Sequence, residues 1–221
     1  MNLSGYATLT RQTFKTHSKG YFMPKFLHVG CGQKRKVQTT QGFNTPEWTE
    51  IRFDIDEGVV PDVVGTMTDM SAIADGSVDA IFSSHNIEHL YPHEVTVALK
   101  EFLRVLTPAG LAVITCPDLQ SVCALIADNK LTQPAYQSPA GAITPLDILY
   151  GHRASMQQGN LYMAHRCGFT RDVLSATLRQ AGFISVGALA RPQYFDLWAF
   201  ASKETLTQEQ LTDIARTHGL A

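Results

Sequence analysis

The chain has 221 residues, 44% of them hydrophobic, and a formal net charge of −2 from 18 basic and 20 acidic side chains. This length suits one well-buried domain, and the nearly balanced charge excludes a general affinity for nucleic acid or for an anionic membrane surface. No apolar run approaches the ~20 residues of a membrane-spanning helix, and the N-terminal segment lacks the apolar stretch of a secretory signal.

Residues 1–22 show no clear periodicity, and we interpret them as an N-terminal arm before a domain that covers residues 23–221. Short apolar runs then predict five buried strands, because such runs are typical of parallel sheets. They cover 26–29, 50–54, a weak strand over 59–60 and 62–65, then 79–83 and 111–115.

Helices are predicted between and after these strands. From Pro92, apolar residues including Leu106 recur with the spacing of one buried helix face, and the turn at 107–110 should end this helix. Further helices are predicted over 119–128, over 170–181 with Thr170 as its cap, and from a capping box at Thr207. The stretch 133–145, rich in Pro, Gly, Ser and Thr, is predicted to be a loop.

Two more strands, 183–189 and 195–201, are joined by a linker too short for a crossover helix, so they should pair antiparallel. The earlier alternation of strand and helix indicates right-handed crossovers. We therefore predict an α/β fold with a Rossmann-like, doubly wound, seven-stranded sheet that is mostly parallel and has an antiparallel C-terminal edge strand. A segment of about residues 119–167 forms an insertion after the fifth strand.

Polar and glycine residues stand where the predicted parallel strands end. Gly30 and Gly32 follow the first strand, Asp54 ends the second, Asp69 follows the third, and 83–86 ends the fourth. Ligands of open parallel sheets bind outside these carboxyl ends, so the residues should share one crevice. A dinucleotide site also needs a third glycine, and here that stretch is polar and basic.

These segments resemble the class I S-adenosylmethionine-dependent methyltransferases, in particular the broad small-molecule group called type 11. The matching segments are LHVGCG (27–32), RFDID (52–56), TDMSAIADGSVDAIFSSHNIEHL (68–90) and LKEFLRVLTPAGLAVITCPD (99–118). The resemblance implies S-adenosyl-L-methionine as cofactor and a small-molecule or glycan-type acceptor of its methyl group. It also explains the missing third glycine, because this cofactor carries no phosphate.

The resemblance implies specific cofactor contacts. Asp54 would accept hydrogen bonds from the ribose hydroxyls, and Asp69 would accept one from the adenine amino group. Met70 would give a backbone N–H and an apolar face. The cofactor-binding residues that we predict are Gly30, Cys31, Gly32, Asp54, Ile55, Asp69, Met70, Ser84 and His85.

Simpler roles are open for several of these residues. Asp54 could cap a helix or lie in a solvated turn, and Asp69 could only cap the turn at Ser71. Glu88 and His89 are interpreted as structural. The helix that usually follows the glycines should be short or absent over 33–48, where Lys34 or Arg35 could replace its positive end or simply be solvated.

A general base is needed only for an acceptor such as a hydroxyl. His85 and His165 are the candidate catalytic residues, with His152 as a further possibility and a hydrogen-bonded wall role equally open for His85. Arg153 and Arg166 are candidates for contact with an anionic acceptor. No residue spacing suggests a metal site, so none is predicted.

Two other functions are weighed against methyl transfer. A non-catalytic member of the fold could act as a binding or accessory protein, and an NADP-dependent reductase could hold a 2′-phosphate with residues 34–36. Four cysteines stand singly, which favours free thiols and a reducing, cytoplasmic setting. We expect no nucleic-acid or membrane partner, and a homodimer is left open.

Overall fold

The computed structural model describes residues 23–220, so the expected arm over 1–22 lies outside the described residues. The strands are β1 (Lys25–Val29), β2 (Thr49–Asp54), β3 (Val63–Val64), β4 (Val78–Ser84), β5 (Leu106–Pro117), β6 (Tyr136–Ser138), β7 (Gly141–Ile143), β8 (Ser185–Arg191) and β9 (Asp196–Ser202). The α-helices are α1 (Pro92–Val105), α2 (Leu119–Ala127), α3 (Pro145–Tyr150), α4 (Arg153–Gln157), α5 (Arg171–Ala181) and α6 (Gln208–Thr217). Short 3-10 helices are η1 (Lys36–Gln38), η2 (Glu57–Val59), η3 (Ile87–His89), η4 (Leu161–Met163) and η5 (Pro192–Tyr194).

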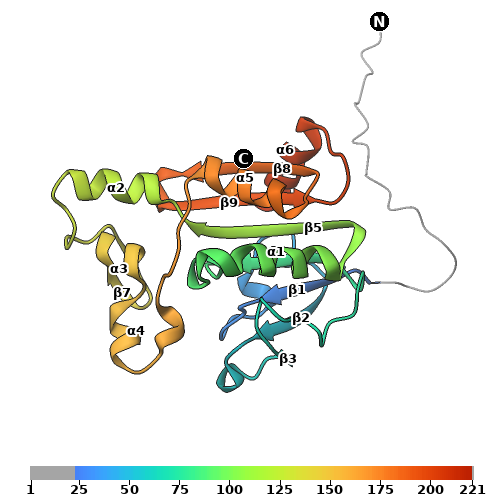
Figure 1. Cartoon of the computed structure of the whole chain (residues 1–221), viewed down its shortest axis with the longest axis horizontal. Coiled ribbons are helices and arrows are strands. Elements are labelled where there is room, and N and C mark those ends of the chain that lie inside the picture. Colours follow the sequence, from blue (N-terminus) through green and yellow to red (C-terminus); the bar gives the residue numbers. More distant parts are fainter. Residues whose placement is uncertain (1–22, 221) are drawn as a thin grey trace, which may run out of the picture.

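Seven strands form one sheet in the order β3-β2-β1-β4-β5-β9-β8, and the small pair β6-β7 is separate (Figure 1). Strands β1 to β5 pair in parallel, whereas β9 runs antiparallel to both β5 and β8. This arrangement confirms the predicted seven-stranded α/β sheet with a C-terminal hairpin at its edge. Within the hairpin the antiparallel strand is β9, which lies next to β5, so that β8 takes the outermost place.

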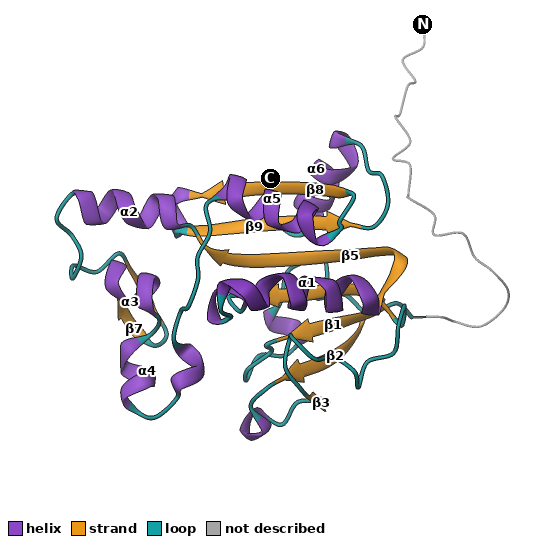
Figure 2. Ribbon diagram, viewed as in Figure 1, coloured by secondary structure: helices purple, strands orange, loops and turns teal. Residues whose placement is uncertain are grey.

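One face of the sheet packs against α1 and α5 (Figure 2). Because side chains alternate along a strand, Leu27 and Ile81 both point to this face and join its core. The apolar stripe of α1 packs onto them, with Leu99 and Phe102 fully buried. The periodicity that predicts this helix is therefore the periodicity of its buried side.

The boundaries of this region differ from the prediction at one point. Helix α1 begins at Pro92, as expected, and ends at Val105. Leu106 was expected on the helix face, but it belongs to β5 and pairs with Val78. The pairing register between β4 and β5 shifts between Val78 and Ala80. Residues 107–110, expected as a turn, therefore lie within β5 at this irregularity.

The second face of the sheet has a different cover. Leu211 of α6 packs there, and so does Phe43 from the connection between β1 and β2. The Phe43 ring stacks on Phe26 of β1 at a centroid distance of 4.5 Å, and Trp48 meets it edge-on at 5.3 Å. Apart from η1 this connection is irregular, which confirms that the usual helix after the glycine turn is missing. Aromatic packing takes its place.

The insertion over 119–167 forms a lobe beside the carboxyl ends of β1 and β2, where their arrowheads point in Figure 1. It contains α2, as predicted, but the expected loop over 133–145 includes the hairpin β6-β7. The weak strand is also shorter than expected, because residues 57–59 form η2 and Val60 is left-handed with φ +51°. None of the helices in the described part of the chain combines the length and apolar character needed to cross a membrane.

Candidate functional site

The turn after β1 brings two glycines to the end of the sheet. Gly30 and Gly32 have φ of +61° and +51°, left-handed values that favour glycine. A Cβ on Gly30 would lie 1.9 Å from Oδ1 of Asn86, whereas a Cβ on Gly32 would meet no atom of the described residues within 4 Å. The backbone of Gly32 is therefore open to a ligand at this edge, while Gly30 makes room for Asn86.

The carboxylate of Asp54, at the end of β2, faces this turn. Its Oδ2 accepts a hydrogen bond from the Gly32 N–H at 2.7 Å, and its Oδ1 accepts one from the Asp56 N–H at 2.9 Å. Only 7% of Asp54 is exposed, so these bonds offset the burial of a charged group. A carboxylate has about four lone-pair positions, which leaves two for further donors. Ile55, 47% exposed, adds apolar surface beside it.

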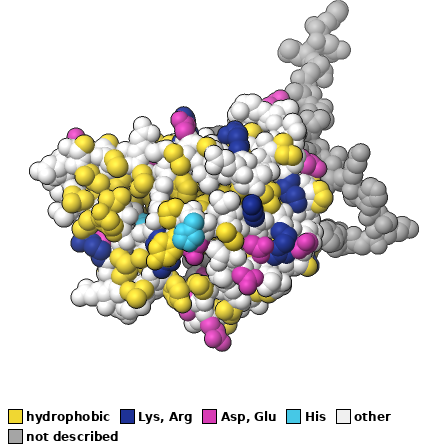
Figure 3. Space-filling view, viewed as in Figure 1, with side chains coloured by type: hydrophobic (Ala, Val, Ile, Leu, Met, Phe, Trp, Pro, Cys, Tyr) yellow, Lys and Arg dark blue, Asp and Glu magenta, His cyan; other side chains and the backbone are white. Residues whose placement is uncertain are grey.

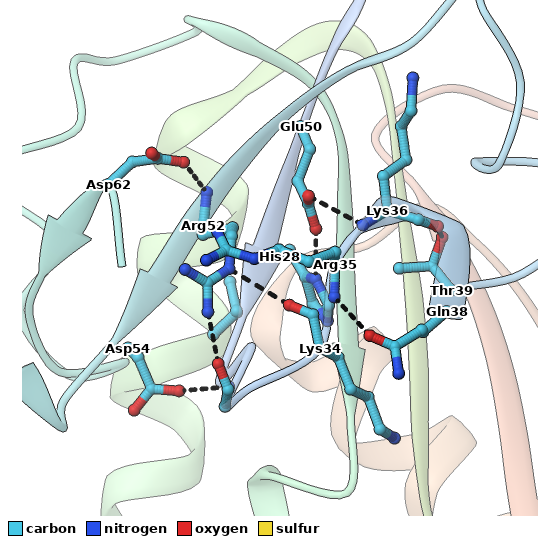
Figure 4. Close-up of polar contacts among 12 residues, drawn as sticks. His28, Lys34, Arg35, Lys36, Gln38, Thr39, Glu50, Arg52, Asp54 and Asp62 are labelled. Atoms are coloured by element: carbon cyan, nitrogen blue, oxygen red, sulfur yellow. Dashed lines mark hydrogen bonds and ion pairs between the residues drawn. The ribbon is translucent and has the colours of Figure 1, made fainter. Parts of the chain in front are cut away.

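Arg52, which sequence reasoning missed, holds the two loops around this edge together (Figure 4). Its buried guanidinium donates to the carbonyls of Gly32 and Val60 at 2.5 Å and of Lys34 and Val59 at 3.2 Å. These carbonyls belong to the turn after β1 and to the end of η2. The sequence signal that could have found it is a basic residue between the apolar Ile51 and Phe53 of a predicted strand.

Cys31 lies between the glycines, and its side chain points into the protein. It is 1% exposed, and its N–H donates to the Phe53 carbonyl at 3.3 Å. Burial raises the pKa of the Cys31 thiol to about 11, so the thiol stays protonated near neutral pH. Cys31 therefore offers the site its backbone and no nucleophile. All four cysteines are free; Cys116 is buried as well, whereas Cys123 is exposed.

The predicted adenine edge, at Asp69 and Met70, needs one correction. The Met70 N–H already donates to Oε2 of Glu101 at 2.8 Å, and the Met70 side chain is fully buried in the core. Met70 therefore offers neither the N–H nor the apolar face that we expected. The Asp69 side chain is exposed and accepts from the Ser71 N–H at 3.1 Å, which is the turn cap weighed as its alternative. Hydrogen bonding to Ser71 also lowers the pKa of Asp69.

The end of β4 reaches the same edge from the other side. Thr115 donates to the hydroxyl of Ser84 at 3.0 Å, and the Asn86 amide donates to the carbonyls of Ser84 and Val29. His85 follows with φ +56°, an unusual backbone for a residue with a side chain, and 48% of that side chain is exposed. Such conformations cluster at functional sites. The side chain of His85 is thus presented to solvent beside Ser84.

The second catalytic candidate, His165, lies at the junction of the insertion and the sheet domain. Its Nδ1 donates to the carbonyl of Ile148 at 2.8 Å, and its ring meets that of His89 edge-on at 4.8 Å. Burial lowers the pKa of His165. Glu88 lies in the same cluster.

The other residues of the insertion that were candidates for contact with the acceptor already contact neighbouring side chains. Nδ1 of His152 lies 2.8 Å from Oγ of Ser155. Arg153 pairs with Asp147 at 2.7 Å, while Arg166 packs over the ring of Tyr91 at 4.7 Å. These contacts give each side chain a structural partner.

Two hollows flank the strand ends. One of about 320 Å³ is bordered by Lys34, Ser84, Arg191, Trp198 and His218 among others. A larger one of about 520 Å³ lies between the start of α2 and the β8–β9 turn, beside Asp118. Neither is lined by Gly32 or Asp54, so both lie beside the edge that these two residues form.

The fold and the site define a class of protein. A seven-stranded sheet with one antiparallel strand, a glycine turn after β1 and an acid at the end of β2 are the features of the class I methyltransferase fold noted above. Residues 27–114 match the family model described as a methyltransferase domain. No curated protein sequence matches the chain.

Solved structures agree with this. One is an S-adenosylmethionine-dependent methyltransferase from Thermotoga maritima, described as a possible histamine N-methyltransferase; its TM-score is 0.53 at 14% identity, over 81% of this chain and 82% of that one. A methyltransferase from Archaeoglobus fulgidus scores 0.51 at 16% identity, over 82% and 87%. The 1,6-didemethyltoxoflavin-N1-methyltransferase of Burkholderia thailandensis, with bound 1,6-didemethyltoxoflavin and S-adenosylhomocysteine, scores 0.51 at 15% identity, over 82% and 72%.

At these identities the structures establish a shared fold, and the family match places a methyltransferase domain on residues 27–114. Taken together, they show a methyltransferase domain over residues 27–114, within a chain that shares the fold of S-adenosylmethionine-dependent methyltransferases.

Proposed function

We propose that the protein transfers the methyl group of S-adenosylmethionine to a small polar acceptor, either a small molecule or a glycan. When bound, the cofactor supplies a methyl group on a sulfonium, which is a good leaving group. The protein then has to hold the acceptor atom within ~3–3.5 Å of that carbon, aligned for displacement, and exclude water.

The residues at the strand ends fit the sugar and base of this cofactor. The two open lone-pair positions on Asp54 match the pair of ribose hydroxyls, and the open backbone at Gly32 permits close approach. Ile55 offers an exposed apolar side chain to the flat base. We assign adenine recognition to Asp69 and Ile55, without Met70, because the Met70 N–H is already donated to Glu101.

The acceptor side is supported by the hollow that shares Ser84 with the cofactor edge. Lys34, Trp198 and Arg191 border this hollow. The Arg191 guanidinium pairs with Asp196 and lies over the Trp198 ring at 5.1 Å, so Lys34 is the cation that an acceptor would meet. A lysine beside polar side chains suits a polar acceptor that carries an acidic group. The 1,6-didemethyltoxoflavin acceptor of the Burkholderia enzyme shows that this fold serves a small heterocycle in that protein.

The insertion is the second part of the proposed acceptor site. Apolar side chains gather on the face of this lobe seen in Figure 3, and Tyr150, Leu161 and Tyr162 are each more than half exposed. Side chains of this kind are suited to close over a bound acceptor and to exclude water.

We assign the general base to His85, should the acceptor be a hydroxyl. The ring is exposed beside Ser84, and its Nδ1 lies 3.4 Å from Oε1 of buried Glu88. Protonation of this ring would therefore be favoured by the nearby carboxylate, as a general base requires. His165 suits this role less well, because its Nδ1 is bonded to Ile148 and its ring packs on His89.

The contact between Asp54 and the open Gly32 carries this proposal, and calorimetry with S-adenosylhomocysteine tests it. Asp54→Asn should weaken binding roughly 10–100-fold, because a hydrogen bond to a charged group is worth about 1.5–3 kcal/mol. Asp56→Asn is the matched control: it changes the next acid along the chain, whose Oδ1 only caps Gly58. The control should bind within about twofold of the wild type.

Equal binding by the Asp54 variant and the wild type would refute the assignment of the cofactor edge. Transfer of labelled methyl groups to a panel of acidic sugars, phenols and heterocycles then tests the acceptor class. Turnover only with a protein or nucleic acid would overturn the small-acceptor proposal while leaving the cofactor site intact.

A further inference from the structure

Glu88, in the middle of η3, carries a buried carboxylate whose one ion-pair contact among residues 23–220 is with the half-exposed His85. The residue is 1% exposed, and neither oxygen has a hydrogen bond among residues 23–220. The His85 contact at 3.4 Å is longer than a hydrogen bond of good geometry. Unpaired carboxylates are among the costliest groups to bury, and buried charges are normally paired or bound to a metal. The carboxylate therefore calls for a positive charge beside it.

Two histidines lie close to this carboxylate. His89 faces the carbonyl of Ala164 through Nδ1 at 3.1 Å, and His165 faces the carbonyl of Ile148 in the same way at 2.8 Å. A carbonyl oxygen can only accept, so Nδ1 carries the proton in both rings. Each neutral ring then keeps a lone pair on Nε2. This is the arrangement of metal-binding histidines, whose second ring nitrogen is held by a carbonyl or carboxylate.

One ligand atom each from Glu88, His89 and His165 lie within 4.8 Å of one another. Around a tetrahedral zinc ion with bonds of about 2.1 Å, such atoms would stand about 3.4 Å apart. Closing this difference requires small side-chain rotations by His89 and His165, both of which are partly exposed.

We propose that Glu88, His89 and His165 form a binding site for a divalent transition-metal ion, best suited to Zn²⁺. Two imidazoles and one carboxylate suit zinc or iron(II), and neither Mg²⁺ nor Ca²⁺ favours imidazole. The site joins two parts of the chain that are far apart in sequence. Glu88 and His89 belong to the sheet domain, and His165 belongs to the insertion. A bound ion would therefore fix the lobe against the sheet. Sequence spacing gave no sign of it, since 76 positions separate His89 from His165.

The test measures zinc uptake by the full chain, stripped with a chelator and dialysed, in competition with a chromophoric chelator. We expect one ion per chain. Glu88→Gln and His165→Gln should each weaken binding more than the roughly 10–100-fold that loss of an outer-shell partner costs. His93→Gln is the control, because His93 is exposed on α1 and does not belong to the cluster. It should bind zinc like the wild type.

Two further measurements make the result independent of variant folding. Co²⁺ bound to the wild type should show d–d absorption without a thiolate charge-transfer band, since the ligands are nitrogen and oxygen. Zinc should also slow hydrogen exchange in residues 144–165. Failure of the wild type to take up zinc, or equal uptake by the folded Glu88 and His165 variants, would overturn the proposal. Because none of these readouts involves methyl transfer, the outcome is separate from that of the proposed function.

Discussion

Substitution of Arg52 tests how the glycine turn is held without a following helix. Arg52→Met keeps an apolar stem of similar length but removes the guanidinium that donates to four carbonyls. At a net value of about 1 kcal/mol for each hydrogen bond, the loss is about 4 kcal/mol. The substitution also removes the free-energy cost of burying a charged guanidinium, and this offsets part of the loss. We expect the free energy of unfolding to fall by about 3 kcal/mol.

Urea unfolding followed by circular dichroism measures this change directly. For a chain of this size, 1 kcal/mol shifts the melting temperature by roughly 2–4 °C, so Arg52→Met should melt about 6–12 °C lower. The same variant should bind S-adenosylhomocysteine at least tenfold more weakly, because the Gly32 carbonyl is no longer fixed.

Lys36→Met is the matched control, since Lys36 also holds loop carbonyls, those of Thr45 and Trp48, but at the other end of the connection. It should lose stability and keep its affinity for the cofactor product. Arg52→Met with wild-type stability, or with wild-type affinity beside a lowered melting temperature, would refute the role of this residue in holding the site.

Two further predictions concern the glycine turn and the second face. Gly32→Ala should cost about 1–2 kcal/mol of stability for a left-handed alanine, as urea unfolding will show. It should also weaken S-adenosylhomocysteine binding at least tenfold by calorimetry, because its Cβ occupies the space proposed for the ribose; unchanged affinity would contradict that placement. Burial lowers the pKa of His218 from 6.5 to about 4, so the unfolded chain binds this proton more readily than the folded one. The free energy of unfolding should therefore fall by about 2 kcal/mol between about pH 7 and about pH 5, and His218→Gln should lack this part of the pH dependence.

The fold was predictable because its signals are local. The apolar stripe of α1 starts at Pro92, a capping box opens α6 at Thr207, and the short linker before β9 forces an antiparallel hairpin. Each of these features is set by residues within a few positions of one another. The hairpin β6-β7 was missed because turn-forming residues dominate 133–145, and its short strands carry no alternating pattern.

The candidate site was only partly predictable, for a physical reason. Gly32 and Asp54 follow strand ends, and the parallel sheet brings all such positions to one edge, so their proximity could be foreseen. The Met70 N–H could not be assigned, since its partner Glu101 lies 31 positions later in the sequence, within α1. The same holds for Glu88, whose surroundings include His165 from the end of the insertion.

The buried Arg52 takes over part of the role of the helix that is missing after the glycine turn. A helix after the glycine turn would supply about half a positive charge from its N-terminus and would cover β1 and β2. Here Phe43 and Trp48 provide cover, and the guanidinium places a full positive charge directly behind the Gly32 and Lys34 carbonyls. Those carbonyls accept hydrogen bonds from the Arg52 guanidinium, so the turn is fixed from inside the protein. The Gly32 N–H therefore stays directed at Asp54. The electrostatic support of the cofactor edge therefore comes from one side chain of β2, and a single substitution removes it.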